Sequence, residues 1–331
     1  MLLEDARQLK SSLINSLMTV TASAATVRSL GVRTQGLGSA TDALRSLAIG
    51  ISQHKKEMRL AIRVQRRAML DHPILDQIRK QSKGEVDVRY VGRITKLETP
   101  TTLQKRRRPL VIGCSIGHLD VTAGTLGCFA VTRVGKKKVI LSNNHVLANE
   151  NDAKAGDAIL QPGKFDRGRK PADVVATLLK FVKLKVTSTN LVDCATALPS
   201  AGIAFNEKKL GSFGVLKGLG PEFLDEGTIV HKVGRTTGQT TGKVTAFELD
   251  NVVVSYDIGN LRFDNQIEIE GTGTKAFSDG GDSGSLIFDE GHLGVGLLFA
   301  GGDSGGSNDK GLTYANPLKA VLDALKVNLL F

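Results

Sequence analysis

The spacing of apolar residues changes about a third of the way along the chain. Over residues 3–20 apolar positions recur at helical spacing, with Leu9, Leu13 and Leu17 on one face, which predicts an amphipathic helix. Three strand-like runs follow, over residues 47–51, 58–65 and 86–92. A short helix is expected between the last two, over residues 73–81, with Pro73 near its start. This order predicts a small α+β unit over residues 1–95, followed by a polar, basic linker over 96–110.

From residue 111 onward the pattern is one of short β segments separated by glycine-containing turns. Five such segments are residues 127–132, 138–142, 243–247, 251–256 and 266–270. Closely spaced strands with turn signals are typical of β-barrels. An apolar helix over Pro317–Leu325 ends the pattern. We therefore expect a mainly β protein in which residues 111–331 form one β domain behind the smaller N-terminal unit.

The turn at Gly281-Asp282-Ser283-Gly284 immediately precedes the apolar run 286–288 and carries the chemistry expected of a nucleophile. A serine hydroxyl needs a base to take its proton, and a histidine titrates in the right range. His145 follows the strand-like run 138–142, and Asp193 lies in an apolar segment between the two. We assign Ser283 as nucleophile, His145 as general base and Asp193 as the group that orients the imidazole. Backbone N–H groups of Gly281 and Ser283 would form the oxyanion hole.

Each of these residues has a rival in the sequence. Ser304, in a second Gly-Asp-Ser-Gly, is followed by Gly, Ser, Asn and Asp residues that indicate a loop rather than a strand. His118 and His231 do not stand at a strand-to-turn transition. Asp173 is not flanked by apolar runs on both sides, as Asp193 is. Context therefore favours Ser283, His145 and Asp193.

In residue order and local context, these segments resemble trypsin-like (chymotrypsin-fold) serine peptidases over roughly residues 111–330. The run 232–242, Lys-Val-Gly-Arg-Thr-Thr-Gly-Gln-Thr-Thr-Gly, makes the bacterial intracellular-type members the closest. The resemblance implies a double β-barrel with the triad in the cleft between barrels, His145 and Asp193 from the first and Ser283 from the second. It also implies a serine endopeptidase that forms an acyl-enzyme on Ser283 and acts on protein or peptide substrates.

The same resemblance suggests where a substrate would bind. A substrate strand would pair with the segment Leu298, Phe299, Ala300 and Gly301, and the base of the primary pocket would lie near Lys275, Ala276 and Phe277. Because no acid stands there, a preference for basic residues is disfavoured. We expect small or medium apolar residues, with acidic residues as the alternative through Lys275. The sequence departs from secreted relatives at Val146, where they often carry a bridged cysteine, and leaves Asp282 without an assigned partner.

Charge is distributed unevenly along the chain. Residues 1–110 hold 21 Lys and Arg against 9 Asp and Glu, a net charge of +12, whereas the whole chain carries +11. We hypothesise that the basic unit regulates the protease or docks an acidic protein partner. Nucleic-acid association is the less favoured alternative, because residues 1–110 contain no Phe or Trp for base stacking. A second alternative is a latent or inactive protease fold that serves as a binding scaffold.

Composition excludes several other classes. The three cysteines and six histidines show no metal-ligand spacing, so neither a metal nor a cofactor is expected. Three cysteines in apolar contexts are typical of buried free thiols in a reducing compartment. The acidic N-terminus is unlike a signal peptide, and no apolar run is long enough for a membrane span. These features predict a cytoplasmic protein.

Overall fold

The structure is a computed structural model of the 331-residue chain. It describes residues 1–29, 46–54, 57–92, 94–95 and 102–331, and for residues 17–29, 94–95 and 102 it describes the backbone alone. The side chain of Leu17 and part of the expected linker over 96–110 therefore lie outside the described residues.

The second β-barrel lies in the C-terminal half of the chain and is closed. Its six strands follow the order β15, β20, β21, β22, β19 and β16, and pairing of β15 with β16 completes the circle. Their bounds are Ile229–Gly234, Leu286–Asp289, Leu293–Gly302, Leu312–Pro317, Gln266–Gly271 and Gly238–Asp250. Inward-facing residues such as Val230, Val244 and Ile269 form its core. The segments predicted as strands over 243–247 and 266–270 lie within β16 and β19.

The first barrel is a half-barrel built on one sheet of eight strands. The order is β23, β8, β9, β12, β11, β10, β6 and β7. Their bounds are Val327–Leu329, Cys128–Thr132, Lys138–Ser142, Ala195–Pro199, Val174–Phe181, Ala158–Leu160, Ser115–His118 and Gly124–Thr125. Helix α5 (Leu318–Leu325) packs Val321 and Leu325 into the core of this sheet. The sequence therefore predicted the double β-barrel of chymotrypsin type correctly, although the first sheet is open where the family pattern has a closed barrel.

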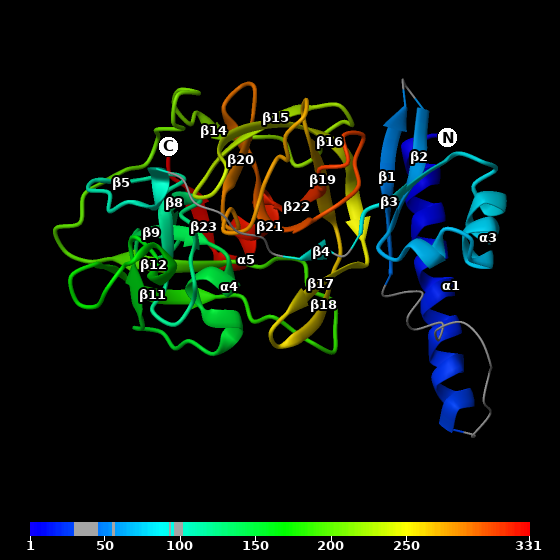
Figure 1. The fold of residues 1–331 in the computed structure, drawn as a ribbon, viewed down its shortest axis with the longest axis horizontal. Helices are drawn as coiled ribbons and strands as arrows, with labels where there is room; N and C mark the ends of the chain where they lie inside the picture. The colour runs from blue at the N-terminus through cyan, green and yellow to red at the C-terminus, as the bar shows by residue number, and fades with distance from the viewer. Residues whose placement is uncertain (30–45, 55–56, 93, 96–101) are drawn as a thin grey trace.

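The N-terminal elements continue the sheet of the second barrel. Strand β1 (Leu47–His54) pairs antiparallel with β16, and β2 (Glu57–Val64) and β3 (Val86–Tyr90) follow it outward. Helices α1 (Leu3–Ser29) and α3 (Pro73–Gln81) cover the outer face of these strands, so that the strands lie between the helices and the barrel (Figure 1). The helices and strands expected over residues 1–95 are confirmed.

Successive side chains of β1 point to opposite faces of the sheet, which explains why the strand is buried between the helices and the barrel. Leu47 and Ile49 point to a cluster with Leu13 of α1 and Ile78 of α3. Ala48 points the other way, into a cluster that includes residues of β16, β21 and β22. A strand buried on both faces is held by two cores at once. The boundary of an independent N-terminal domain at residue 95 stays a prediction.

The remaining elements are short. They are β4 (Ile94–Thr95), β5 (Leu110–Val111), β13 (Phe205–Asn206), β14 (Gly218–Leu219), the hairpin of β17 (Val252–Tyr256) and β18 (Gly259–Phe263), the one-turn helix α4 (Asn144–Leu147), and four 3₁₀ turns. The turns are η1 (Arg67–Met69), η2 (Thr102–Gln104), η3 (Asn149–Asn151) and η4 (Lys164–Asp166). Strand β4 pairs with β21, and the β17–β18 hairpin stands outside both barrel sheets.

A buried ion pair joins the N-terminal strands to the second barrel. Arg63 of β2 and Glu268 of β19 are both fully buried, and Arg63 Nε lies 2.7 Å from each carboxylate oxygen. Arg63 Nη1 also pairs with Asp87 of β3 at 3.0 Å. Burial opposes the charge, but attraction to Glu268 and Asp87 raises the pKa of Arg63 above its ordinary value.

Other basic residues of the N-terminal third also meet acids of the second barrel. Arg7 of α1 pairs with Glu248, and Lys10 lies 3.2 Å from Asp250. Part of the segregated positive charge thus has an acidic partner within the chain itself. An external acidic partner stays a prediction.

The three cysteines are free and buried, as the sequence predicts. Burial raises the pKa of Cys114 to about 11 and that of Cys128 to about 12, so both thiols stay protonated near neutral pH. Within the parts of the chain that the structure describes, no helix combines the length and apolar character needed to cross a membrane.

Candidate active site

His145 and Asp193 are brought into direct contact by the first barrel. Strand β9 ends at Ser142 and leads into α4, which carries His145, while Asp193 lies just before β12. His145 Nδ1 is 2.5 Å from Asp193 Oδ2, and Asp193 is fully buried. The other carboxylate oxygen, Oδ1, accepts hydrogen bonds from the backbone N–H groups of Asn144 (2.6 Å) and His145 (3.3 Å). The carboxylate thereby fixes both the ring and the backbone of the histidine.

The backbone of Asp193 is fixed from both barrels. Its N–H donates to Asn316 Oδ1 of β22 at 2.9 Å, and its C=O accepts from Asn143 Nδ2 at 2.7 Å. These two bonds fix the position of the Asp193 backbone next to His145.

Ser283 lies on a tight turn between the barrels. Its C=O accepts a hydrogen bond from the Thr125 N–H of the first barrel at 2.8 Å. Gly281 and Gly284 have φ of +80° and +93°, which favours glycine. At Gly281 a Cβ would lie 2.0 Å from Arg235 Nη1, so both the backbone angle and the available space require glycine there.

Two backbone N–H groups of this turn have no hydrogen-bond acceptor among the described residues, namely those of Gly281 and Ser283. The C=O of Gly280 accepts from Thr236 Oγ1, and the C=O of Asp282 accepts from Ser285. A trans peptide directs its C=O and the following N–H in opposite directions. The N–H groups of Gly281 and Ser283 therefore point away from these donors and are free to bind an anionic oxygen.

Asp282, which had no assigned partner, is fully buried and paired with Lys232 of β15. Lys232 Nζ lies 3.1 Å from Asp282 Oδ2, and Lys232 is also fully buried. Asp282 Oδ1 accepts from the Thr236 N–H at 2.8 Å, and Thr237 Oγ1 donates to Oδ2 at 2.6 Å. Burial lowers the pKa of Lys232, while attraction to Asp282 opposes this change. The run 232–242 thus supplies the groups that hold the serine turn.

Replacement of Lys232 by Met is expected to destabilise the protein by about 2 to 3 kcal/mol, because Asp282 loses its cation but keeps its other donors. The turn at Gly281 should loosen with it, so labelling of Ser283 should slow. Chemical denaturation and the rate of labelling by an active-site serine probe measure the two effects. Lys243→Met, on neighbouring β16, is the matched control and should change neither. Wild-type behaviour of Lys232→Met would contradict this account.

The serine turn and the histidine helix meet at Gly124 of β7. A Cβ there would lie 2.4 Å from Val146 Cγ2 and 3.1 Å from the Ser283 C=O. Ser283 and His145 are 6 % and 7 % exposed, respectively, so both are largely shielded from water. No hydrogen bond joins the two side chains within the described chain, which is common in unliganded active sites.

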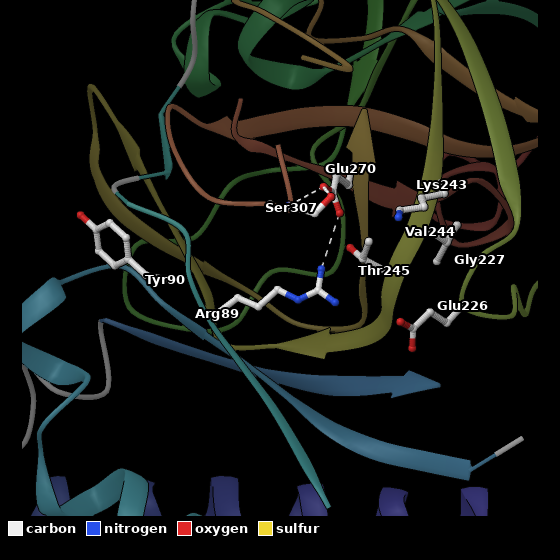
Figure 2. Close-up of a pocket in the computed structure, with 10 residues that line it drawn as sticks. Arg89, Tyr90, Glu226, Gly227, Lys243, Val244, Thr245, Glu270 and Ser307 are labelled. Atoms are coloured by element: carbon white, nitrogen blue, oxygen red, sulfur yellow. Dashed lines mark hydrogen bonds and ion pairs between the residues drawn. The ribbon is translucent and has the colours of Figure 1, made fainter. Parts of the chain in front are cut away.

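The rival serine lies in a different environment. Gly92, which follows β3, packs so closely on the loop of Ser304 that a Cβ there would lie 2.1 Å from Ser304 Oγ. Ser307 of the same loop donates its backbone N–H and its hydroxyl to Glu270 of β19. Figure 2 shows this contact, with Arg89 of β3 reaching Glu270 from the other side, at a cavity of about 440 Å³. The loop fastens the second barrel to the N-terminal strands.

The alternative histidines and aspartate, His118, His231 and Asp173, each contact other residues. His118 Nε2 lies 3.3 Å from Asp157, and His231 Nδ1 lies 2.9 Å from Thr241 Oγ1. Asp173 accepts a hydrogen bond from the Arg169 N–H and lies 3.6 Å from Arg106. Of the acids and histidines weighed from the sequence, the structure brings together His145 and Asp193.

The expected substrate-binding residues divide into two groups. Phe277 and Leu298 are buried in the core of the second barrel, and Phe299 is buried against Phe263 with ring centroids 4.7 Å apart. Their side chains therefore pack within the protein. Ala276 and Lys275 are more open, at half-buried and exposed positions. The backbone of Ala300 and Gly301 continues β21 beyond its pairing with β20.

Among known proteins, similarity is found to solved structures. No family model matches the sequence, and the search of curated proteins finds no match. The structure is similar to Nocardiopsis protease (16% identity, 67% of this chain and 99% of that chain, TM-score 0.47). It is also similar to a glutamic acid specific serine protease (22% identity, 67% of this chain and 100% of that chain, TM-score 0.47). A third similar structure is Thermobifida fusca protease A (14% identity, 67% of this chain and 98% of that chain, TM-score 0.46). All three identities are below 25%, and all three TM-scores are below 0.5.

Several residues at the site escaped the sequence analysis. Tyr256 Oη lies 2.6 Å from Asp193 Oδ2, although the run 251–256 indicated only a strand. Lys232 lies in the run 232–242, which indicated only the family resemblance and not the ion pair with Asp282. Ser278 Oγ and Thr313 Oγ1 share a hydrogen bond of 2.6 Å next to Gly301. Each contact joins residues far apart in sequence, so no local pattern could reveal it.

Proposed function

We propose that this protein is a serine endopeptidase in which Ser283 is the nucleophile, His145 the general base and Asp193 the group that orients the imidazole. The observation that carries the proposal is the 2.5 Å contact between His145 Nδ1 and the buried Asp193, beside a serine turn with two free N–H groups. Geometry of this kind serves acyl transfer. The protease-like fold of the solved structures agrees with it.

The reaction would proceed in two steps. Ser283 Oγ attacks the carbonyl carbon of the scissile peptide while its proton passes to His145 Nε2, and the N–H groups of Gly281 and Ser283 bind the oxyanion. His145 returns the proton to the leaving amine, which departs and leaves an ester on Ser283. Water, deprotonated by His145, then hydrolyses the ester and restores the serine. Asp193 stays ionised and stabilises the imidazolium.

The proposal is tested by incubating the full chain with a mixture of peptides and identifying the products by mass spectrometry. Cleavage at a consistent set of peptide bonds is the expected result. Absence of cleavage by the wild-type chain would favour the alternative, a protease-fold scaffold. A matched incubation with His145→Gln distinguishes cleavage by this site from that by a contaminating protease.

The same experiment reports specificity. We propose a preference for small or medium apolar residues before the scissile bond, with acidic residues as the alternative. Phe277 and Leu298 fill the core, while the hydroxyls of Ser278 and Thr313 lie next to Gly301. Lys275 is exposed. It supports the acidic alternative if its ammonium group reaches the bound side chain.

We further propose that the N-terminal unit regulates the site by occupying the edge of β21. Strand β4 pairs antiparallel with β21, Thr95 opposite Gly301 and Ile94 opposite Gly302. Strand β20 leaves that edge after Leu297, and the Gly284 N–H of the serine turn donates to the C=O of Leu298. An extended peptide that adds to a sheet edge forms the same backbone hydrogen bonds. A substrate strand at Gly301 would thus compete with β4.

This competition predicts the effect of a proline in β4. Thr95→Pro removes a backbone N–H and weakens strand pairing, so KM for peptide substrates should fall while kcat changes little. The control is Thr102→Pro, at the first residue of η2, where proline is tolerated. Steady-state kinetics on one peptide measures both. A KM that is unchanged or higher in Thr95→Pro would contradict regulation through this edge.

The cytoplasmic location also stays a proposal. It is supported by the three buried free thiols, none of which is paired in the described chain. Immunodetection after cell fractionation would test it, and recovery of the protein outside the cytoplasm would contradict it.

A further inference from the structure

The β17–β18 hairpin lies next to the His145–Asp193 pair and contacts both the first barrel and the N-terminal strands. It belongs to neither barrel sheet. Toward the first barrel, Phe263 forms a β-bridge with Asn190, whose N–H donates to the Arg262 C=O at 2.9 Å. The Ile258 N–H donates to Glu150 Oε2 at 3.1 Å. Toward the N-terminal strands, Gln65 Nε2 donates to the Val253 C=O at 3.0 Å. The hairpin is thus fixed at both ends.

Tyr256 of this hairpin contacts both members of the pair. Its Oη lies 2.6 Å from Asp193 Oδ2, and its ring meets the His145 ring edge-on with centroids 5.7 Å apart. On its other side it stacks on Phe263 at 6.0 Å. Burial, together with the charges of Asp193 and Glu150, raises the pKa of Tyr256 well above its ordinary value. The phenol therefore stays protonated and donates its hydrogen to the carboxylate.

The contact completes the hydrogen bonding of Asp193. Oδ1 accepts from two backbone N–H groups, and Oδ2 accepts from His145 Nδ1 and Tyr256 Oη. An ionised carboxylate accepts about four such bonds, so its plane is fully determined. Without the phenol, Oδ2 would have one donor fewer and the carboxylate could turn about its Cβ–Cγ bond. The orientation of the imidazole depends on that plane.

We infer that Tyr256 is a positioning residue for catalysis, which holds Asp193 from the β17–β18 hairpin and, through it, keeps His145 in the productive orientation. This inference rests on the proposed function. It assigns the β17–β18 hairpin a role in the reaction. The residue that acts directly on the proton remains His145.

Tyr256→Phe tests the inference, because phenylalanine keeps the ring contacts with His145 and Phe263 and removes only the hydroxyl. We expect kcat to fall about 10- to 100-fold, the effect of one hydrogen bond to a charged group, with KM nearly unchanged. Loss of the donor leaves more negative charge on Asp193, which favours the imidazolium, so the acid limb of the rate profile should move to higher pH. Glu150 and Asp193 are the charged groups that face the phenol.

The controls separate a catalytic effect from a structural one. Tyr90→Phe, on β3, should leave kcat and the pH profile unchanged. Proton NMR of the hydrogen between His145 Nδ1 and Asp193 reports the contact independently of activity, and its downfield signal should move in Tyr256→Phe. An unmoved signal and pH profile would overturn the inference. Failure of the proposed function would instead appear as a wild-type chain without activity.

Discussion

Ser283→Ala is expected to lower the rate of peptide hydrolysis by about 10⁶-fold, the effect seen when a triad serine is removed from a serine protease. The reason is that His145 has no hydroxyl left to activate, while the free N–H groups of Gly281 and Ser283 can still bind an oxyanion. The loss should be confined to kcat. Because Ser283 is small and its hydroxyl has no hydrogen-bond partner in the described chain, stability should change little.

Ser304→Ala is the matched control, since it removes the hydroxyl of the same local motif. Ser304 lies against Gly92 and contacts Asp303, so hydrolysis should be preserved. Initial rates on one peptide, with both variants checked for folding by circular dichroism, decide the matter. If Ser304→Ala were the inactive variant, the assignment of the nucleophile would be wrong.

Glu268→Gln is expected to destabilise the protein by about 3 to 5 kcal/mol, because it leaves the buried Arg63 without its main counter-charge. That is a large part of the stability of an ordinary protein. Tyr314 and Thr245, which also hydrogen-bond to Glu268, should be disturbed as well. Denaturant unfolding at fixed pH gives the change in free energy.

Two further variants show whether the effect comes from the buried charge. Arg63→Met combined with Glu268→Leu removes both charges and should restore much of the loss. Arg79→Gln breaks the exposed pair with Asp76 on α3 and should change stability by no more than about 0.5 kcal/mol. A small effect of Glu268→Gln would mean that the N-terminal strands are only loosely joined to the barrel.

Local patterns predicted the elements well. The helix from Pro73 to Gln81, the strand before His145 and the glycine turn at Ser283 each follow from a few adjacent residues. Local patterns did not predict that the N-terminal strands extend the sheet of the second barrel, because this depends on β1 pairing with β16 about 200 residues away. The composition also pointed to an external acidic partner for the basic third, whereas Glu268 and Glu248 already lie against it.

At the site, too, local sequence patterns reveal some residues, and long-range contacts determine the others. His145, Asp193 and Ser283 are recognisable because each stands in a distinctive local context. Tyr256 and Lys232 are not, since their contacts with Asp193 and Asp282 join residues far apart in the sequence. A tyrosine that ends a strand and a lysine that begins a glycine-rich turn are ordinary surface residues in sequence. Phe277 and Phe299 are expected at the substrate site from the resemblance alone, and in the structure their side chains are buried.

The central claim is that Ser283 is activated by His145, and covalent labelling tests it most directly. The full chain is treated with a fluorophosphonate, digested, and the modified residue is mapped by mass spectrometry. The account predicts one adduct, on Ser283, that is absent after Ser283→Ala or His145→Gln and retained after Ser304→Ala. An adduct on Ser304, or a wild-type chain that takes up no label, would contradict it.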